Sequence, residues 1–401
     1  MGLDPKRTVA ELEELRALTG DENGAQRVAW TDTWEQAREW LRGKVAATGA
    51  VEEIDEAGNQ WFTLAGGSDK ALLIGGHIDS VPNGGWLDGC LNVMAGVEVL
   101  RRIAADGKPP LTVRLVNWAD EEGARFGRSL FGSSAAAGSM ADQEELRQRH
   151  DASGIALPDA LRDHGVDLDR ALEARKQLES AVAYLELHIE QGPVLESMDL
   201  PLGVVLGTFG VERHQITWKG QAAHAGSTPM DKRRDALAGA AKLALEIRPI
   251  AAEVGNGAVC KSGGVVCKPG IVTSVVETAE QLLDQRHLNA DSLARLLSLA
   301  QAASERFAAE EDIEVSWERI WSIEPILFDD DLVELAEESI REVSGTAHRL
   351  PSGPLHDAAE VARAGVPTVM LFVQSLRGLS HISSKTRGRS ISRCPLKRWI
   401  V

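Results

Sequence analysis

Short apolar runs that alternate with longer helical patterns constrain the fold of this chain more than any other feature. Three runs have the length, the β-branched content and the flanking Gly, Pro or Asp of buried strands: 71–75 (ALLIG), 112–117 (TVRLVN) and 367–373 (PTVMLFV). Residues 92–105 and 330–344 instead place apolar residues at helical spacing, with charges on the opposite face. This alternation predicts an α/β fold with a mainly parallel sheet covered by helices.

The middle of the chain has a different pattern. Residues 214–219 (HQITWK) alternate like a solvated strand, and two long helices are predicted at 230–250, opened by Pro229, and at 289–309. The simplest interpretation is a smaller α+β domain that interrupts the first one. The predicted units are a discontinuous domain of residues 1–211 and 323–401 and an inserted domain of residues 212–322.

Composition excludes several classes of function. The chain has 401 residues, with 43 Lys+Arg against 60 Asp+Glu and a net charge of −17, which argues against a nucleic-acid partner because such binding draws on basic residues. An apolar run of about 18 residues, long enough for a membrane span, is absent, and no signal peptide is expected. Four scattered cysteines without a CxxC pair predict neither a disulfide framework nor a zinc knuckle, so a cytoplasmic location is expected.

Polar side chains gather where the predicted strands end, which is where open α/β sheets place their ligand sites. His77 and Asp79 follow the first strand and point the same way on an extended segment, which suits a metal-bound imidazole held by an acid. Asp88 lies among glycines that let the backbone turn its carboxylate toward a cation.

Three further strand ends carry similar groups. The adjacent carboxylates of Asp120, Glu121 and Glu122 would repel one another without a cation or a proton, and one could bind a metal while its neighbour takes a proton from water. His188 follows a strand predicted at 183–187, and His381 follows the strand at 367–373. The candidate ligands at this sheet edge are His77, Asp88, Glu121 or Glu122, His188 and His381.

Each of these features alone has a plainer explanation. A single His is more often a buried or surface histidine, and an acidic triplet is usually a solvated loop. Their coincidence at one edge of one sheet favours a metal site. Imidazoles and carboxylates without thiolates suit zinc, manganese, cobalt or nickel, and a carboxylate shared by two ions would give a dinuclear hydrolytic site.

The inserted domain contributes two more candidates. His224 lies among small residues in 220–230 (GQAAHAGSTPM), where it belongs either to a capping loop before a helix or to a donor for a developing oxyanion. Arg286 could bind a substrate carboxylate through two N–H groups. From the residues alone, a surface salt bridge between Arg286 and Asp284 is the favoured explanation.

Together these motifs resemble those of the dinuclear-metal amidohydrolases related to bacterial carboxypeptidase G and the aminoacylases. The resemblance is closest to the branch of N-carbamoyl-L-amino acid hydrolases, allantoate amidohydrolase and β-ureidopropionase, for which His188 is diagnostic because the peptidase branches carry a carboxylate there. It covers residues 27–381. The motifs are GGHIDSVPNGGWLDG (75–89), DEEGARFGRSLFGS (120–133), HIEQGPVLE (188–196), GQAAHAGSTPMDKRRDAL (220–237) and SGPLHDA (352–358).

The resemblance implies two divalent metal ions per subunit. One would be held by His77, Asp88 and His188. The other would be held by Asp88, which bridges the two, and by Glu122 and His381. Glu121 would act as general base and then as general acid, and Asp79 would orient His77.

The resemblance also implies how the substrate is held. The inserted domain would be a dimerisation and lid domain that carries His224 into the active site of a partner subunit, where it stabilises the oxyanion. Gln191 and Arg286 would hold the substrate, with Arg286 taking its carboxylate.

Two substrate-binding positions depart from the family pattern. Thr273 lies where relatives have an Asn-Val-Ile-Pro-like stretch that helps to bind the carboxylate, and it offers one donor instead of an amide. Pro354 and Leu355 precede His356 where relatives usually have Ala-Gly. These changes are expected to alter specificity at Thr273 and His356.

The implied reaction is hydrolysis of a linear amide C–N bond in a small-molecule substrate. A hydroxide that bridges the metals would attack the ureido carbonyl of an N-carbamoyl amino acid or a related compound, giving an amine, CO2 and NH3. The alternatives are a hydrolase of N-acyl amino acids or dipeptides from the same family and a non-catalytic scaffold relative. The complete ligand set and Glu121 argue against the scaffold, which would not need a proton shuttle.

The last twenty residues differ from the rest of the chain. Residues 382–401 contain six basic residues and no acid, and such runs are usually solvated tails. Because relatives continue past this point with an acidic loop and a closing helix, we hypothesise a shift of the reading frame just after His381.

Overall fold

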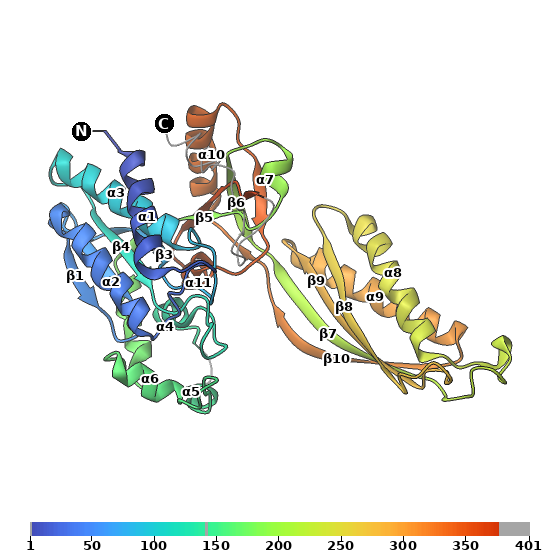
Figure 1. The fold of residues 1–401 in the computed structure, drawn as a ribbon. Helices are drawn as coiled ribbons and strands as arrows, with labels where there is room; N and C mark the ends of the chain where they lie inside the picture. The colour runs from blue at the N-terminus through green and yellow to red at the C-terminus, as the bar shows by residue number, and fades with distance from the viewer. Residues whose placement is uncertain (1, 141–142, 377–401) are drawn as a thin grey trace. The chain divides into compact units, whose positions relative to one another are not determined.

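The computed structural model describes residues 2–140 and 143–376, so His381 and the basic segment at 382–401 lie outside the described residues. The chain divides into two compact units (Figure 1). The second unit is Gly207–Leu327, and the first comprises the chain before it and from Phe328 onward. Each unit has its own hydrophobic core. Within the described ranges, no helix is long and apolar enough to cross a membrane.

The first unit is built on a nine-stranded mixed sheet in the order β1-β2-β4-β3-β5-β13-β6-β11, with β12 beside β6. Its four central strands β4, β3, β5 and β13 are parallel, whereas β1, β2, β6 and β11 pair antiparallel at the two sides. The strands are β1 Val51–Ile54, β2 Gln60–Leu64, β3 Ala71–His77, β4 Thr112–Trp118, β5 Ala181–Ile189, β6 Leu202–Thr208, β11 Ile326–Leu327, β12 Arg349–Ser352 and β13 Thr368–Val373.

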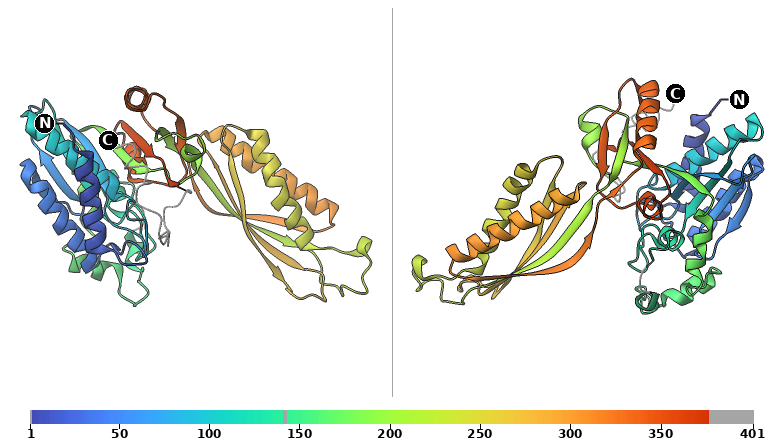
Figure 2. Two further views of the ribbon diagram at one scale, coloured as in Figure 1. Left: turned by 45° about the horizontal axis from the view of Figure 1, so that its top comes forward. Right: turned by 180° about the vertical axis from the view of Figure 1, so that it is seen from behind.

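Helices cover both faces of this sheet, which confirms the predicted α/β class. Helices α1, α2 and α3 pack together, and α3 lies against β3, β4 and β5 (Figures 1 and 2). Helices α4 and α11 pack together on the opposite face, and α10 packs on β13. The helices are α1 Pro5–Thr19, α2 Asp32–Val45, α3 Cys90–Asp106, α4 Phe131–Ala137, α5 Gln143–Arg147, α6 Leu157–Asp163, α7 Val194–Ser197, α10 Asp330–Ser344 and α11 Asp357–Arg363.

The parallel strands at the centre of the sheet bring the predicted strand ends to one edge. Two of these strands are longer than predicted. Strand β3 continues beyond residue 75 and ends at His77, and His188 lies within β5 rather than after it. Strands β3 and β5 extend beyond their predicted ends because their last residues still pair with neighbouring strands. His77 is opposite Trp118, and His188 is opposite Phe372. The two histidines are therefore fixed by the sheet ladder and not by a loop.

The second unit is an antiparallel sheet covered on one face by two helices. The strand order is β10-β7-β9-β8, and α8 and α9 lie side by side on the sheet (Figure 2). The elements are β7 Gly210–Lys219, α8 Ala236–Val254, β8 Val259–Lys268, β9 Thr278–His287, α9 Ala290–Glu310 and β10 Glu314–Ile323. Alternate residues of the strands, such as Ile216 and Trp218 on β7, are fully buried beneath the helices.

The predicted start of the first helix in this unit was wrong. Helix α8 begins at Ala236, whereas residues 230–232 form a single 3-10 turn and Arg233 is extended. Asp235 caps α8 by accepting a hydrogen bond from the backbone N–H of Leu237 at 3.0 Å. The Arg233 guanidinium donates to the backbone carbonyl of Ala225 at 2.6 Å, which holds the preceding segment as a loop.

Candidate metal centre and active site

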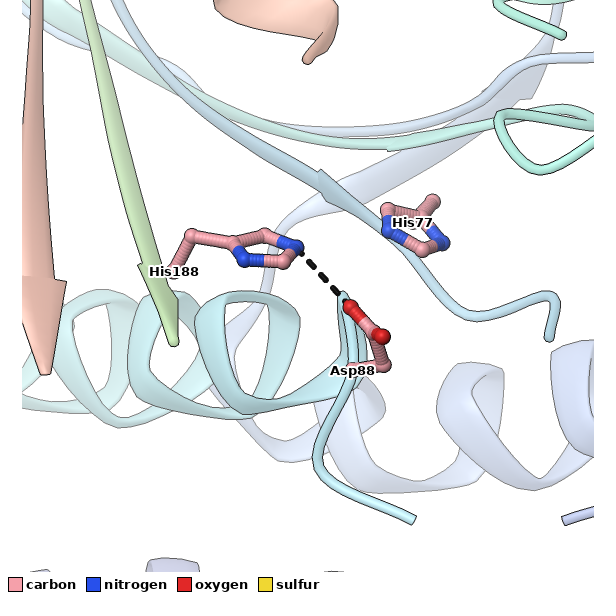
Figure 3. A group of neighbouring side chains, drawn as sticks. All are labelled: His77, Asp88 and His188. Atoms are coloured by element: carbon pink, nitrogen blue, oxygen red, sulfur yellow. Dashed lines mark ion pairs between the residues drawn. The ribbon is translucent and has the colours of Figure 1, made fainter. Parts of the chain in front are cut away.

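His77, Asp88 and His188 meet at the carboxyl-end edge of the parallel strands (Figure 3). One potential ligand atom from each lies within 4.8 Å of the others. The His188 Nε2 atom is 3.1 Å from Asp88 Oδ1, and the two imidazole rings are 5.9 Å apart at their centres. All three residues are at most 2% exposed. Among the residues that the structure describes, these three form the one group of His, Cys, Asp or Glu side chains close enough together to hold a metal ion.

The second nitrogen of each imidazole is held by an oxygen atom. His77 Nδ1 is 3.2 Å from the backbone carbonyl oxygen of Asp79 and 3.4 Å from its Oδ1 atom, and His188 Nδ1 is 2.9 Å from the carbonyl of Ile189. A carbonyl oxygen can only accept, so each Nδ1 carries a proton, and in its neutral form each imidazole has its lone pair on Nε2. Metal-binding histidines in proteins have this arrangement.

Gly89 lets the chain place Asp88 against His77. Its backbone is left-handed, with φ at +63°, and a Cβ at this position would lie 2.3 Å from His77 Nε2. Any larger residue would therefore displace the imidazole nitrogen that faces the cluster.

Asp79 connects this cluster to the acidic segment after β4. Its carboxylate accepts hydrogen bonds from the backbone N–H groups of Glu121 at 3.3 Å and of Glu122 at 3.1 Å. Glu121 Oε2 lies 3.6 Å from His77 Nε2. Asp120, directly before it, has a left-handed φ of 54°, and its carboxylate accepts a 2.8 Å hydrogen bond from the Trp30 indole. The backbone of the acidic segment is thus held by groups from two other segments.

The electrostatics of the cluster favour a bound positive charge. Burial raises the pKa of Glu121 well above its usual range, and the carboxylates of Asp357 and Glu122 raise it further. Burial lowers the pKa of His77, but the negative charge of Glu121 and the contact with Asp79 outweigh it and raise that pKa well above 6.5. A divalent cation satisfies the same acidic surroundings without any proton. With two oriented Nε2 lone pairs beside a carboxylate, the donor set fits such an ion.

Gln191 and His356, both predicted to bind substrate, lie beside the cluster. The Gln191 side-chain amide is 3.1 Å from Asp88 Oδ2, and its backbone has a φ of +56°, which is uncommon for a residue with a side chain. The His356 ring is 4.4 Å from the His188 ring, and His356 is only 2% exposed. Burial lowers the pKa of His356 well below 6.5, so this imidazole is neutral at pH 7.

The remaining predicted residues lie in the second unit, at different ends of its sheet. His224 is exposed and forms a bridge with Ser274, and the neighbouring Ala225 N–H donates to the carbonyl of Thr273 at 2.9 Å. Arg286 lies near the other end of β9, where it contacts Asp284. The structure thus brings His224 and Thr273 together and separates both from Arg286.

Comparison with known proteins identifies the family. The family model for "Peptidase family M20/M25/M40" matches residues 73–386. The chain belongs to this family. It is 35% identical to the N-carbamoyl-L-amino acid amidohydrolase of Geobacillus stearothermophilus over 89% of this chain and 87% of that protein, and 32% identical to the allantoate amidohydrolase of Escherichia coli K12 over the same shares. The crystal structure of an amidase of the hydantoinase/carbamoylase family from Burkholderia multivorans superposes with a TM-score of 0.86 and 28% identity, covering 99% of this chain and 94% of that one.

These comparisons confirm the family and the enzyme class, an amidohydrolase, that the motifs predicted. The structure adds a residue of this M20-family chain that was not predicted. Arg27 is fully buried and donates from Nε to the carbonyl of Ile78 at 2.6 Å and from Nη2 to Cys90 Sγ at 3.4 Å. It links the segment after His77 to the segment after Asp88. No local pattern around Arg27 signals this role, because its partners are distant in the sequence.

Two buried acids behind the cluster were also missed, although a signal existed for each. Glu186 stands alone as a charge in the apolar strand β5, and it accepts hydrogen bonds from Tyr184 Oη and from the Ala358 N–H, both at 2.8 Å. Asp357 directly follows His356 and is fully buried. Burial raises the pKa of both carboxyl groups.

Proposed function

We propose that this protein is a metal-dependent amidohydrolase that removes the carbamoyl group of an N-carbamoyl amino acid or a related ureido compound. The observation that carries the proposal is the buried group of His77, Asp88 and His188 with the Glu121 carboxylate 3.6 Å from one of its imidazoles. The support for the substrate class is the 35% and 32% identity to enzymes named for N-carbamoyl-L-amino acids and for allantoate.

Two divalent ions form part of this proposal. His77, Asp88 and His188 would hold the first, and Asp88, Glu122 and His381 would hold the second, with His381 outside the described residues. Zinc, manganese, cobalt and nickel all suit imidazole and carboxylate ligands. Bound there, such ions would make water a stronger acid and would polarise the carbonyl group of the substrate.

Glu121 is the proton carrier of the proposed reaction. As a general base it takes a proton from the attacking water, and as a general acid it returns this proton to the nitrogen that leaves. One water molecule is added, the C–N bond to the amine breaks, and the carbamic acid that remains decomposes to CO2 and NH3.

Asp79 positions the groups around Glu121. It fixes the His77 tautomer, and it holds the backbone N–H groups of Glu121 and Glu122. Gln191 would hold the substrate near Asp88, and Arg286 would take its carboxylate through paired N–H groups. Thr273 departs from the family pattern, and His356 follows two residues that depart from it. These two residues would set the preference of the enzyme for the substrate side chain.

A homodimer is proposed because His224 and Arg286 cannot reach one substrate from one chain. Both belong to the second unit, where Thr278 begins β9 close to the His224 loop and Arg286 lies eight residues further along the strand. At about 3.3 Å per residue this separates them by roughly 26 Å, far more than the length of an amino-acid derivative. If both residues act on one substrate, they come from two subunits.

The second unit has a surface suited to this dimer. In the described chain β8 pairs with β9 alone, so its other edge presents unpaired backbone N–H and C=O groups. Helix α8, which packs beside β8, exposes Leu237, Ala241 and Leu245 at helical spacing. A second copy of this chain could extend the sheet at β8 and bury this stripe, which makes the second unit a dimerisation and lid domain.

The cysteines support the proposed compartment. Cys90, Cys260 and Cys267 are all free thiols, which fits a reducing environment. We propose a cytoplasmic location.

Release of ammonia tests the substrate class. The purified chain, loaded in turn with Mn, Co, Ni or Zn, is assayed against N-carbamoyl amino acids, allantoate, N-acyl amino acids and dipeptides. We expect one NH3 per amine from an N-carbamoyl compound. Cleavage of N-acyl amino acids or dipeptides without ammonia would replace this function with the alternative one. A folded chain that binds far less than one ion per subunit and cleaves nothing would favour a scaffold.

Subunit complementation tests the composite site. Glu121→Gln and His224→Ala are each produced alone and then co-expressed. In a mixed dimer one site combines the intact Glu121 of one chain with the intact His224 of the other, so random pairing restores about a quarter of the wild-type sites. Co-expression without any gain over the two single variants would contradict a shared site.

A further inference from the structure

Residues 25–27 run alongside the loop that connects the first two proposed metal ligands in the sequence. The backbones of Ala25 and Gly84 exchange two hydrogen bonds, at 3.0 and 3.2 Å. Next to this pair, the Gln26 side-chain amide donates to Asn83 Oδ1 at 2.8 Å. A loop that contains glycines has many conformations of its own, so these contacts help to select one of them. The segment that holds the loop comes before helix α2 and strands β1, β2 and β3 in the chain.

The Arg27 guanidinium continues this contact and joins three parts of the first unit. Its Nε donates at 2.6 Å to the carbonyl of Ile78, the residue directly after His77. Its Nη1 donates to Thr19 Oγ1 at the end of α1, and its Nη2 donates to the sulfur of Cys90 at the start of α3, both at 3.4 Å. Because a guanidinium is planar and rigid, the positions of these three acceptors depend on one another.

Cys90 carries the contact into the turn that holds Asp88. Its thiol donates to the backbone carbonyl of Trp86 at 2.9 Å, and its backbone N–H donates to the carbonyl of Asp88 at 2.6 Å. The sulfur therefore bonds to a residue on the far side of Asp88 while it accepts from Arg27. A non-covalent connection thus runs from the Ile78 carbonyl through the guanidinium and the sulfur to the Asp88 turn.

Arg27 brings a positive charge into this connection, where it is fully buried. The side-chain hydrogen bonds described above go to a carbonyl oxygen, a hydroxyl oxygen and a thiol sulfur, none of which is charged. Like charges repel, so a guanidinium near the cluster opposes the binding of a cation through its charge alone. If Arg27 favours metal binding, it must therefore do so by holding its neighbours in place.

We propose that Arg27 is a positioning residue for the metal centre: it fixes the separation of the segments that carry His77 and Asp88. This inference rests on the proposed function, in which those two residues help to hold the first ion. It deepens that function by giving a residue outside the ligand set a share in metal affinity. The alternative is a purely structural role, in which Arg27 stabilises the first unit and leaves its affinity for metal unchanged.

Metal titration of two Arg27 variants tests the proposal. The full-length chain is freed of metal by chelation and titrated with Co²⁺ in a calorimeter, at a temperature where every variant is folded. For Arg27→Lys, which keeps the charge but loses the planar donors, and for Arg27→Met we expect Co²⁺ to bind about 10- to 100-fold more weakly. Tighter binding in Arg27→Met would show that the charge outweighs the geometry and would overturn the inference.

Arg114→Met is the matched control. Arg114 lies on β4, is 7% exposed, and also donates to uncharged oxygen atoms, at 3.2 Å to Thr63 Oγ1 and at 2.9 Å to the carbonyl of Gln177. Its replacement should lower the melting temperature and leave Co²⁺ affinity within about twofold. If Arg27→Met also lowers only the melting temperature, its role is structural and the inference is overturned.

The visible absorption of bound cobalt gives a readout that a loss of stability does not move. Its bands depend on the number and arrangement of the ligands. At saturating Co²⁺ the bands should change in Arg27→Lys and Arg27→Met and should superpose with those of the wild type in Arg114→Met. Unchanged bands in both Arg27 variants would contradict a role in positioning the ligands.

A pair of Cys90 variants tests the same connection with a smaller change to the fold. Cys90→Ala removes both the acceptor for Arg27 and the donor to Trp86, so we expect Co²⁺ affinity to fall about tenfold. Cys90→Ser keeps a donor and an acceptor on the same atom and should stay within about threefold of the wild type. Equal affinities in Cys90→Ala and the wild type would overturn the inference even if the Arg27 variants do not fold.

His77→Ala separates failure of the inference from failure of the proposed function. We expect this variant to weaken the binding of the first ion more than any change at Arg27. If it binds Co²⁺ as the wild type does, the proposed ligand set is wrong, and the inference falls with it. If it loses affinity while Arg27→Lys and Cys90→Ala keep the wild-type value, only the positioning role of Arg27 is wrong.

Discussion

His77, a candidate metal ligand, and His224, a candidate catalytic residue, are held in different ways by the two units. His77 ends a paired strand, is 1% exposed, and has oxygen atoms against its Nδ1 atom. His224 lies in an exposed loop, where its Nδ1 accepts a hydrogen bond from the Gly226 N–H at 3.1 Å. The first is fixed before any ligand arrives. In the proposed homodimer, the second would become part of a site only through a partner molecule.

This contrast separates two requirements of catalysis. Metal ligands are useful only when their geometry is set within a fraction of an ångström, which packing and the sheet ladder provide. A residue that donates a hydrogen bond to the substrate must leave room for the substrate to enter the site first. An exposed loop allows this. The contrast predicts that small changes are costly in the first unit and tolerated in the second.

The largest effect is expected for Glu121→Gln. The amide keeps the size of the side chain but cannot take a proton from water, so kcat should fall by about 10³-fold or more. Metal content, measured by elemental analysis, should stay close to that of the wild type, because Glu121 is not among the proposed ligands. Turnover near the wild-type rate would overturn the role of Glu121.

The next effect compares one glycine from each unit. In Gly89→Ala the new Cβ would lie 2.3 Å from His77 Nε2 at a left-handed backbone position, so we expect metal affinity and activity to fall by about 100-fold. In Gly226→Ala the Cβ would lie 3.2 Å from His224 Cε1, and this exposed ring can move. Activity should then stay within about threefold. Metal titration calorimetry and kinetics check both variants, and equal losses would remove the contrast.

Metal removal should affect one unit and spare the other. An ion present at about 100 times its dissociation constant stabilises the folded state by about 2.7 kcal/mol. Chelation should therefore speed amide hydrogen exchange in β3 and β5, which carry His77 and His188, and leave β7 and β9 unchanged. In the described residues the second unit holds no comparable ligand group. Faster exchange in β7 and β9 would show that the two units unfold together.

The sequence predicts the elements around the site better than the contacts within it. Strand ends could be located because apolar runs stop at polar residues, and His77 and His188 follow from that pattern, whereas Asp88 follows from the glycines around it. Arg27 could not be found in this way, because the hydrogen bonds that connect it to the site go to Ile78 and Cys90, which are more than fifty residues away. Such contacts depend on tertiary packing, which leaves no local period in the sequence.

The start of α8 shows a different limit. Thr228 and Pro229 have the chemistry of a helix start, and Asp235 has it too. Tertiary hydrogen bonds decide which of these two positions starts the helix. The backbone N–H of Ala236 donates to the carbonyl of Val276, and Arg233 donates to the carbonyl of Ala225. Both positions have residue types that suit a helix start, and the tertiary hydrogen bonds that choose between them leave no local pattern in the sequence.

The smallest effect is expected from a helix cap in each unit. Asn289 caps α9 by accepting a hydrogen bond from the Ser292 N–H at 2.9 Å, and Thr31 caps α2 through the Trp34 N–H at 3.4 Å. Asn289→Ala and Thr31→Ala should each lower the free energy of unfolding of their own unit by about 1 kcal/mol, with the longer bond of Thr31 giving the lesser loss. Amide hydrogen exchange resolves the two units. If Asn289→Ala also speeds exchange in β3 by the same factor, the two units unfold as one cooperative block. The tolerance of small changes that we expect in the second unit could then not arise because it unfolds independently of the first.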